Sequence, residues 1–323
     1  MRVLPPTPDN LSLAAERLAA GRLVAMPTET VYGLAAAARD ALAVGRVFEL
    51  KGRPHDHPLI VHLGPAMDVG EWTVGGSERL ASLAAALWPG PLTVVVRKAP
   101  WVPDAVTGGQ PTVALRVPAH PVALALLRAF GDAVAAPSAN RFGRISPTTA
   151  EHVAAEFAGS DLVVVDGGPC RIGLESTIVD LTGEVARVLR PGGVPVEVVE
   201  AAIGERVELA GGAKTPRVPG SLPSHYAPAT PASLLDAVEL EARANACPGV
   251  GVLARRPAPG WFGGMWVELP DDPVAYGAGL YAALRRLDAA GPSEILIEHV
   301  PGAATWLAVR DRLERATARG RGA

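Results

Sequence analysis

The basic residues that follow a predicted helix near the N-terminus are the first sign of chemistry in this sequence. They are Lys51, Arg53, His55 and His57. Only Asp56 offsets them, and Pro54 and Pro58 keep this backbone out of a helix. A stiff cationic loop of this kind suits the binding of an anion such as a phosphate. The alternative is a solvated charge cluster at a helix end, where cations meet the helix dipole favourably.

The polar run of Thr28, Glu29 and Thr30 favours the binding interpretation. It directly follows an apolar segment at residues 23–26, which predicts a strand. Open α/β sheets bind ligands where their strands end. The polar run and the basic loop flank one predicted helix, so we expect both to face the same crevice.

A second polar loop covers residues 137–148, with the sequence PSANRFGRISPT. Its short hydrogen-bonding side chains are Ser138, Asn140, Ser146 and Thr148. Short donors approach phosphate oxygens closely, and the helix predicted to follow adds backbone N–H groups at its start. An ordinary turn rich in Ser and Asn is the alternative interpretation.

Three polar residues stand at the ends of other predicted strands. Arg116 closes one strand, Ser176 opens another, and Arg190 ends a third just before Pro191. A guanidinium in such a place can clamp a carboxylate or phosphate through two parallel hydrogen bonds. Its alternative role is a surface ion pair, which contributes little.

Histidine and cysteine patterns do not predict a metal site. His55 and His57 are spaced as a possible ligand pair, but no third ligand of suitable spacing is visible, so we expect no metal held by protein side chains. His62 lies inside an apolar strand, as a core residue or as a ligand contact. Cys170 and Cys247 form no CxxC or Cys/His pattern. Motifs of P-loops, dinucleotide folds, zincins and serine hydrolases are absent from the sequence.

Composition indicates a large packed protein of the cytoplasm. The chain has 323 residues, of which 49% are hydrophobic and 20% charged, and the length suggests about two domains. The net charge of -3 argues against a surface that binds nucleic acid throughout. Two scattered cysteines fit a reducing compartment, and early prolines do not fit a signal peptide. We therefore expect a soluble cytoplasmic protein without a membrane span.

The order of predicted elements indicates an α/β fold in two parts. Apolar runs and amphipathic helices alternate over residues 1–205, which predicts a mixed twisted sheet with flanking helices. Residues 206–231 are rich in proline and glycine and predict a linker or lid. A second unit follows at residues 232–323, with strands at 251–254 and 294–298 and helices at 273–290 and 303–318.

Several motifs in this order resemble the YrdC-like domain of the threonylcarbamoyl-AMP synthases. They are PTETVYGL, KGRPHDHPLIVH, LRVP, SANRFGRISPT, ESTIVD and RPG, and they extend over about residues 5 to 200. The SHYAP of the linker and the small C-terminal unit resemble the long, two-domain form. The resemblance implies a YrdC-like twisted mixed sheet with flanking helices, a lid, and a small Rossmann-like α/β domain.

The resemblance also implies an activity. Enzymes of this family are nucleotidyltransferases that form threonylcarbamoyl-AMP and pyrophosphate from L-threonine, bicarbonate and ATP, with Mg²⁺ bound to the ATP. The product serves the threonylcarbamoyladenosine modification of tRNA and passes to a tRNA threonylcarbamoyl-transferase complex. We therefore expect these small-molecule substrates, and neither a membrane partner nor stable binding of nucleic acid.

The resemblance assigns roles to individual residues. The implied threonine contacts are Thr30, His62, Arg116, Ala136 and Ser176. The implied ATP contacts are Lys51, Arg53, His57, Thr112, Ser138, Asn140, Ser146 and Arg190. Lys51 and Arg53 would be the catalytic cations, and His225 and Tyr226 of the lid would fold back over the pocket.

The sequence departs from the common family pattern at three positions. His57 stands where Asn is frequent, Pro137 where Thr is frequent, and Phe142 where Ser is usual. His57 can still donate a hydrogen bond to a phosphate. Pro137 removes a hydroxyl and an amide near the expected threonine pocket, which leaves Ala136 as a backbone or apolar contact.

Two other functions fit parts of the pattern. Related domains inside larger carbamoyltransferases form carbamoyl-adenylate from carbamoyl phosphate, but they carry extra domains and often zinc motifs that this sequence lacks. A module that binds double-stranded RNA by shape would use the same basic concavity. The acidic overall balance weakens that alternative, because binding driven by phosphates needs a broad basic face.

Overall fold

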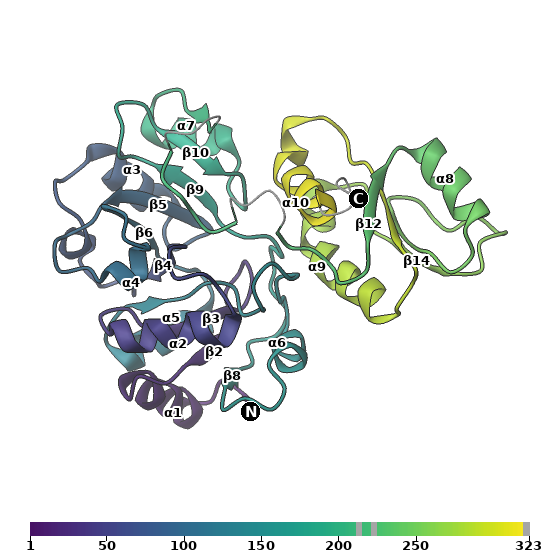
Figure 1. Ribbon diagram of the computed structural model, residues 1–323. Helices are drawn as coiled ribbons and strands as arrows, with labels where there is room; N and C mark the ends of the chain where they lie inside the picture. Colours follow the sequence, from purple (N-terminus) through teal and green to yellow (C-terminus); the bar gives the residue numbers. More distant parts are fainter. Residues whose placement is uncertain (211–214, 221–224, 319–323) are drawn as a thin grey trace. The chain divides into compact units, whose positions relative to one another are not determined.

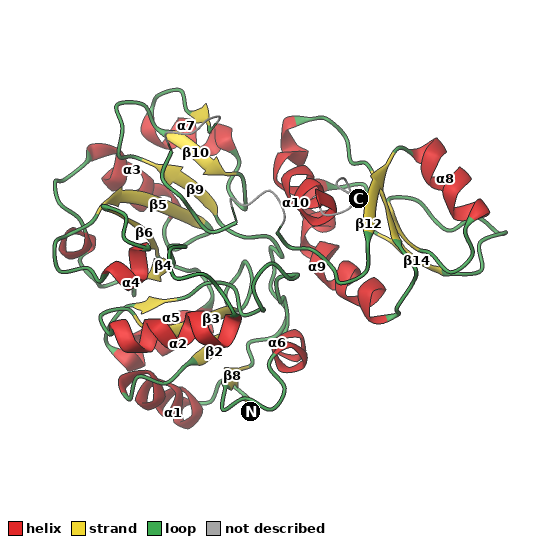
Figure 2. Cartoon of the chain, in the orientation of Figure 1, coloured by secondary structure: helices red, strands yellow, loops and turns green. Residues whose placement is uncertain are grey.

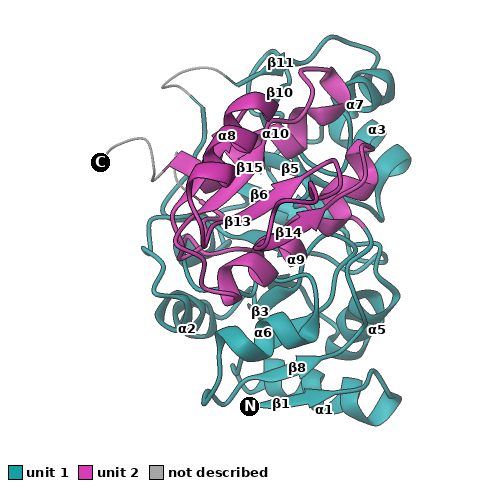
Figure 3. Cartoon of the chain, turned by 90° about the vertical axis from the view of Figure 1, so that its right-hand side faces the viewer, with its two compact units in different colours: residues 1–142, 147–171, 175–221 teal, residues 143–146, 172–174, 222–323 magenta. Residues whose placement is uncertain are grey.

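The computed structural model describes residues 1–210, 215–220 and 225–318, and the chain divides into two compact units (Figure 1, Figure 3). Unit 1 comprises residues 1–142, 147–171 and 175–221, and unit 2 comprises residues 143–146, 172–174 and 222–323. Two short segments of the predicted catalytic region thus pack with the C-terminal unit. Of the expected lid at residues 206–231, positions 211–214 and 221–224 lie outside the described residues.

Unit 1 is built on one mixed sheet. Its strands are β1 (Arg2–Leu4), β2 (Val24–Met26), β3 (Gly33–Ala37), β4 (Ile60–His62), β5 (Leu92–Arg97), β6 (Thr112–Arg116), β7 (Val134–Ala135), β8 (Val163–Val165), β9 (Thr177–Asp180), β10 (Arg187–Arg190) and β11 (Glu208–Leu209). They lie in the order β1-β8-β2-β3-β7-β4-β6-β5-β9-β10-β11. This confirms the α/β class and the mixed sheet expected from the sequence.

Helices flank this sheet, as Figure 2 shows. The described helices of unit 1 are α1 (Pro8–Ala19), α2 (Ala41–Lys51), η1 (Val69–Trp72), α3 (Glu78–Leu87), α4 (Asp104–Thr107), α5 (Pro121–Phe130), α6 (Ala150–Glu156) and α7 (Val196–Ile203). Helix α1 packs against α5, and α3 packs against α7. No helix of the described residues is long and apolar enough to cross a lipid bilayer.

Local sequence explains why α2 ends where it does. The Asp40 carboxylate caps its start by accepting hydrogen bonds from the N–H groups of Leu42 and Ala43, at 2.9 and 3.1 Å. Val47 and Phe48 are buried on its inner face. Gly52 then adopts a left-handed conformation, with φ of 62°, which ends the helix. The last helical residue, Lys51, is consequently carried into the interior of unit 1.

The register of the sheet brings residues that are distant in sequence to the same end of neighbouring strands, called the sheet edge below. Strands β4 and β6 are parallel, and His62 pairs in register with Arg116. Strand β5 is antiparallel to β6, β9 is parallel to β5, and β10 is antiparallel to β9. The ends of β4, β6 and β10 therefore meet the starts of β5 and β9. Fully buried apolar side chains from these strands hold the edge in place: Val61, Leu115, Val94 and Val179.

Unit 2 contains a second, fully parallel sheet. Its strands are β12 (Ala232–Leu235), β13 (Gly251–Ala254), β14 (Met265–Glu268) and β15 (Ile295–Glu298), in the order β12-β15-β13-β14. Its helices are α8 (Ala237–Ala246), α9 (Pro273–Ala289), η2 (Ala304–Trp306) and α10 (Leu307–Thr317). Helix α8 connects β12 to β13 and helix α9 connects β14 to β15, which gives parallel strands in the expected Rossmann-like arrangement. The helix predicted at 303–318 is a 3₁₀ turn followed by α10.

Candidate functional site

A buried ion pair links the polar run after β2 to the end of β6. The Nη2 group of Arg116 donates to Oε1 of Glu29 at 2.6 Å, and each side chain is 4% exposed. The second carboxylate oxygen accepts the backbone N–H of Ala119 at 3.0 Å. Burial opposes ionisation of Glu29, but Arg116 and the backbone donors outweigh it and lower the pKa of this carboxyl. The Glu29 carboxylate thereby holds the guanidinium in a fixed orientation.

The guanidinium of Arg116 is only partly used by the protein. Its Nε donates to the carbonyl oxygen of Gly90 at 3.2 Å, and Nη2 bonds Glu29. Among the described residues, Nη1 has no hydrogen-bond partner. This atom is not shielded from solvent, so a ligand can reach it. A fixed cation with a spare donor can bind a carboxylate.

His62 lies beside Arg116 as a neutral ring. Burial, followed by the charge of Arg116, lowers the pKa of His62 to about 3. Its Nδ1 lies 3.2 Å from the carbonyl oxygen of Ile60, so the neutral ring carries its proton there and Nε2 is an acceptor. An acceptor at this position suits an N–H or O–H donor of a ligand.

The turn after β2 is fixed by its own hydroxyls. Oγ1 of Thr28 lies 2.7 Å from Oγ1 of Thr30 and accepts the backbone N–H groups of Thr30 and Val31 at 3.2 Å. Both threonines are buried. Arg116 and Ala119 also hold this turn, because they bind the Glu29 carboxylate between the two threonines.

Ser176 and Arg190 form a second buried group at this sheet edge. Arg190 donates to the carbonyl oxygen of Ser176 from Nε at 3.1 Å and from Nη2 at 2.8 Å, and Nη2 lies 3.1 Å from the Ser176 hydroxyl. The same hydroxyl lies 2.7 Å from Oγ1 of Thr93 at the start of β5. Arg190 also bonds the carbonyl oxygen of Pro219 at 2.9 Å, which ties the linker to the sheet.

Lys51 organises the loop that follows β7. Its Nζ donates to the carbonyl oxygen of Ser138 at 2.6 Å and to that of Asn140, while its own carbonyl accepts the N–H of Phe142 at 2.9 Å. Burial, followed by the charge of Arg53, brings the pKa of the Lys51 ammonium well below its usual range. Two carbonyl dipoles and an anionic ligand would each favour the protonated form.

Arg53 and His57 meet over the ring of Phe142. The Arg53 guanidinium lies 5.7 Å from the ring centroid and donates to the carbonyl oxygen of Pro58 at 2.9 Å, and the His57 ring meets Phe142 edge-on at 5.4 Å. Burial and the charge of Arg53 lower the pKa of His57. Phe142, where the family usually has Ser, thus supports two of the expected ATP contacts. The basic residues do not form a solvated cluster: Lys51 at the helix end and Arg53 in the following turn are both buried.

The remaining expected residues of unit 1 lie around these groups or apart from them. Ala136 is buried after β7, and its N–H bonds the carbonyl oxygen of Ile60 at 2.9 Å. Thr112 begins β6, at the opposite end from Arg116, and lines a pocket with Asp180 and Arg187. No contact links Thr112 to the groups at the strand ends within the described part of the chain.

Three expected residues belong to unit 2. Ser146 is buried, and its carbonyl oxygen accepts Nε of Arg285 at 3.4 Å. The ring centroids of His225 and Tyr226 are 4.1 Å apart, and Tyr226 stacks on Tyr281 at 5.7 Å. The Arg312 guanidinium lies 5.1 Å from the Tyr226 ring, and the Tyr226 backbone has a positive φ of 60°. His225 and Tyr226 are buried, and the side chains of Tyr281 and Arg312 in unit 2 pack against Tyr226.

Two residues at the site were not assigned a role from sequence. Glu29 was visible as a polar residue after a strand, but its partner Arg116 is 87 positions away. Thr93 lies in a continuously apolar run and carried no signal of its own. Only the strand order places these side chains beside the expected ones.

Comparisons with known proteins agree with this architecture. The Sua5–YciO–YrdC family model, described as telomere recombination, matches residues 16–192, and the model for the threonylcarbamoyl-AMP synthase C-terminal domain matches residues 194–318. The threonylcarbamoyl-AMP synthase of Pyrococcus abyssi is 40% identical over 321 residues, covering 95% of this chain and 94% of the relative. That of Bacillus subtilis is 39% identical over 324 residues, covering 95% and 92%.

A solved structure is similar over both units. The crystal structure of P. abyssi Sua5 complexed with L-threonine has a TM-score of 0.90 and 36% identity, and the match covers 98% of each chain. The protein is thus an α/β protein whose mixed sheet carries fixed, buried cations at its strand ends, groups of the kind that suit anionic ligands. The chain belongs to the Sua5–YciO–YrdC family, in the form that carries the threonylcarbamoyl-AMP synthase C-terminal domain.

Proposed function

We propose that this protein forms threonylcarbamoyl-AMP and pyrophosphate from L-threonine, bicarbonate and ATP. Membership of the family over both domains supports this activity, as does the solved complex of a similar protein, P. abyssi Sua5, with L-threonine. The observation that carries the proposal is Arg116, a buried cation oriented by Glu29 with a donor left for a ligand. The enzyme would work in the cytoplasm and pass its product to a tRNA threonylcarbamoyl-transferase complex.

Threonine would bind near the ends of β4 and β6 and the start of β9. Arg116 would bind the carboxylate, and Nε2 of neutral His62 would accept a hydrogen bond from the amino acid. Thr30, Ala136 and Ser176 would complete this pocket. The ion pair with Glu29 matters here because it fixes the cation before threonine arrives, so that little ordering is left for the binding step.

ATP would bind along the loop that Lys51 organises. Lys51, Arg53 and Arg190 would neutralise phosphate charge, and the further ATP contacts proposed are His57, Thr112, Ser138, Asn140 and Ser146. A bound triphosphate would raise the depressed pKa of Lys51, since a nearby anion favours the ammonium form. Binding and protonation of Lys51 would therefore be coupled.

Mg²⁺ would enter as part of the MgATP substrate. Among the described residues, no group of three or more His, Cys, Asp or Glu side chains is arranged to hold a metal ion. The Glu29 carboxylate at the strand-end site has both oxygens bonded, one to Arg116 and one to Ala119. The phosphate oxygens and water are then the natural ligands of this ion.

The chemistry has two steps. The threonine amine adds to the carbon of bicarbonate, and water leaves as the carbamate forms. A carbamate oxygen then attacks the α-phosphorus; the new P–O bond forms as the bond to pyrophosphate breaks. Such a transfer depends on positioning and on charge neutralisation, which Lys51 and Arg53 would supply without a protein nucleophile. The linker with His225 and Tyr226 is proposed to act as the lid during this sequence.

Pyrophosphate release tests the proposal directly. Release should require L-threonine, bicarbonate and ATP together, and omission of L-threonine or of bicarbonate should reduce it to background. Carbamoyl phosphate should not replace threonine and bicarbonate. Release from ATP alone, or no release with all three substrates, would overturn the assignment.

A further inference from the structure

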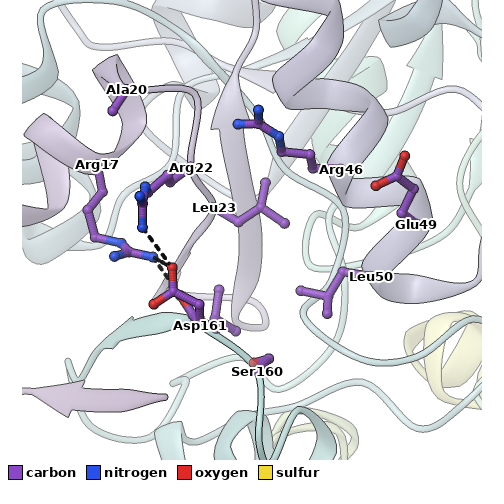
Figure 4. Close-up of a pocket in the computed structure, with 10 residues that line it drawn as sticks. Arg17, Ala20, Arg22, Leu23, Arg46, Glu49, Leu50, Ser160 and Asp161 are labelled. Atoms are coloured by element: carbon purple, nitrogen blue, oxygen red, sulfur yellow. Dashed lines mark hydrogen bonds and ion pairs between the residues drawn. The ribbon is translucent and has the colours of Figure 1, made fainter.

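A pocket in unit 1 lies apart from every residue assigned above (Figure 4). It opens between the end of α1, the start of β2, the exposed side of α2 and the loop before β8, and its volume is about 680 Å³. Thr28 to Thr30 follow the carboxyl end of β2, whereas this pocket lies at the amino end of that strand. It therefore belongs to the opposite end of the strand from the proposed threonine site.

Three arginines from three different places in the chain line this pocket. Arg17 comes from the last turn of α1, Arg22 precedes β2, and Arg46 comes from α2. Leu23, Leu50 and Leu162 give the pocket an apolar surface beside them. Guanidinium groups next to apolar side chains suit a ligand that has both an anionic group and an apolar or aromatic part.

The charges are only partly neutralised inside the protein. Oδ2 of Asp161 accepts from Nη2 of Arg17 and from Nη1 of Arg22, each at 3.0 Å. The Arg46 guanidinium donates to the carbonyl oxygen of Gly21 and has no carboxylate partner within 4 Å among the described residues. Nε of Arg17 is shielded from solvent and has no hydrogen-bond partner in the described part of the chain. Glu49 also lines the pocket, and no ion pair links it to these three arginines among those residues.

The Asp161 carboxylate already pairs with two of these arginines. Hydrogen bonding from Arg17 and the charge of Arg22 lower the pKa of Asp161, although its side chain is 76% exposed. Asp161 is an exposed carboxylate held by two guanidiniums, the same kind of interaction that an anionic ligand group makes with arginine. Because it remains open to solvent, Asp161 can be displaced or joined by such a group at little cost.

We propose that this pocket binds a phosphate monoester of about nucleotide size. Arg22 and Arg46 approach the phosphate, Arg17 supports Arg22 through Asp161, and the leucines contact the organic body. Phosphate matches the guanidinium forks, and the pocket volume falls within the range of small-ligand sites, roughly 300–1,000 Å³. Asp161 acts as an internal counterion that weakens binding. The site is independent of the proposed synthase activity and does not need it to be correct.

Methyl NMR of leucine-labelled full-length protein tests the site at its own residues. Titration with AMP should give saturable shifts at the methyl groups of Leu23, Leu50 and Leu162. Arg46→Gln should weaken the fitted affinity about tenfold, because a charge-assisted bond is lost. Asp161→Asn should strengthen it. Arg206→Gln, at a side chain that is 96% exposed elsewhere in unit 1, is the matched control and should leave it unchanged.

The choice of probe decides the ligand class. Ribose 5-phosphate should bind, and adenosine, which lacks the phosphate, should not. Inorganic phosphate should bind more weakly than AMP because it leaves the leucines uncovered. The proposal is overturned if no methyl shift saturates, if Arg46→Gln binds AMP as tightly as the parent protein, if adenosine binds equally well, or if only an RNA oligomer binds.

Discussion

Two ion pairs of unit 1, Arg116 with Glu29 and Arg22 with Asp161, both join an arginine to a carboxylate, but the first is buried and the second is exposed. Arg116 and Glu29 are each 4% exposed, whereas Arg22 and Asp161 are 57% and 76% exposed. The buried carboxylate has both oxygens bonded by protein donors, while Asp161 stands in water. Burial makes the first pair a fixed part of the fold, and exposure leaves the second pair able to exchange partners. Arginine–carboxylate pairs are therefore rigid at one end of β2 and adaptable at the other.

The largest expected effect comes from breaking the buried pair. Glu29→Ala leaves the Arg116 charge buried without its partner and should reduce the free energy of unfolding by about 3–5 kcal/mol. Urea denaturation monitored by circular dichroism measures this. Glu29→Gln keeps an acceptor and should lose less. A Glu29→Ala protein as stable as the parent would show that the pair does not anchor the sheet edge.

Lys51 is also buried, but we expect it to serve the reaction, whereas the pair of Arg116 and Glu29 stabilises the fold. Lys51→Ala should lower the rate of pyrophosphate release about 100-fold, because a cation at the transferred phosphate is lost. Lys98→Ala is the matched control, since Lys98 pairs with the exposed Asp104 at 2.5 Å and should keep the parent rate. The circular dichroism spectrum of each variant verifies folding. Equal rates for both folded variants would remove Lys51 from the proposed machinery.

The neutral state of His62 predicts a pH effect of intermediate size. Its pKa is about 3 in the folded protein and about 6.5 when unfolded, so only the unfolded chain takes up a proton between these values. The stability of the parent should fall as the pH drops below 6.5, and His62 should account for about 1 kcal/mol of this between pH 6.5 and 5.5. His62→Gln should lose that part of the slope in denaturation measured across this range. If stability falls equally with pH in the parent and in His62→Gln, then His62 takes up its proton in the folded protein as well, and the prediction is wrong.

The smallest effect is expected at the exposed pair. Arg22→Gln removes one of the two cations that hold Asp161, yet water and Arg17 still satisfy the carboxylate. The urea midpoint should be the same as that of the parent within error. A loss of stability comparable to that of Glu29→Ala would mean that exposure does not distinguish the two regions.

Sequence patterns predicted the strands with strong apolar runs. The strand expected at residues 23–26 is β2, and the apolar strand that holds His62 is β4. Arg116 and Arg190 end β6 and β10 as expected, and Ser176 directly precedes β9. The pattern missed β3 at Gly33–Ala37, because small residues have little strand preference and this segment becomes a strand through pairing with β2 and β7. It also missed β12, α8 and β14 of unit 2, whose sequences carry weak periodicity.

The sequence by itself determined the α/β class, the linked family motifs and the residue types that an anion site needs, because these depend on local order along the chain. Only the tertiary structure decided that Lys51 is buried against two carbonyl groups, that Glu29 orients Arg116, and that Arg17, Arg22 and Arg46 share one pocket. Strand order and register set these contacts. Coulomb and desolvation energies depend on separation in space and on access to water, and neither quantity can be read from spacing along the chain.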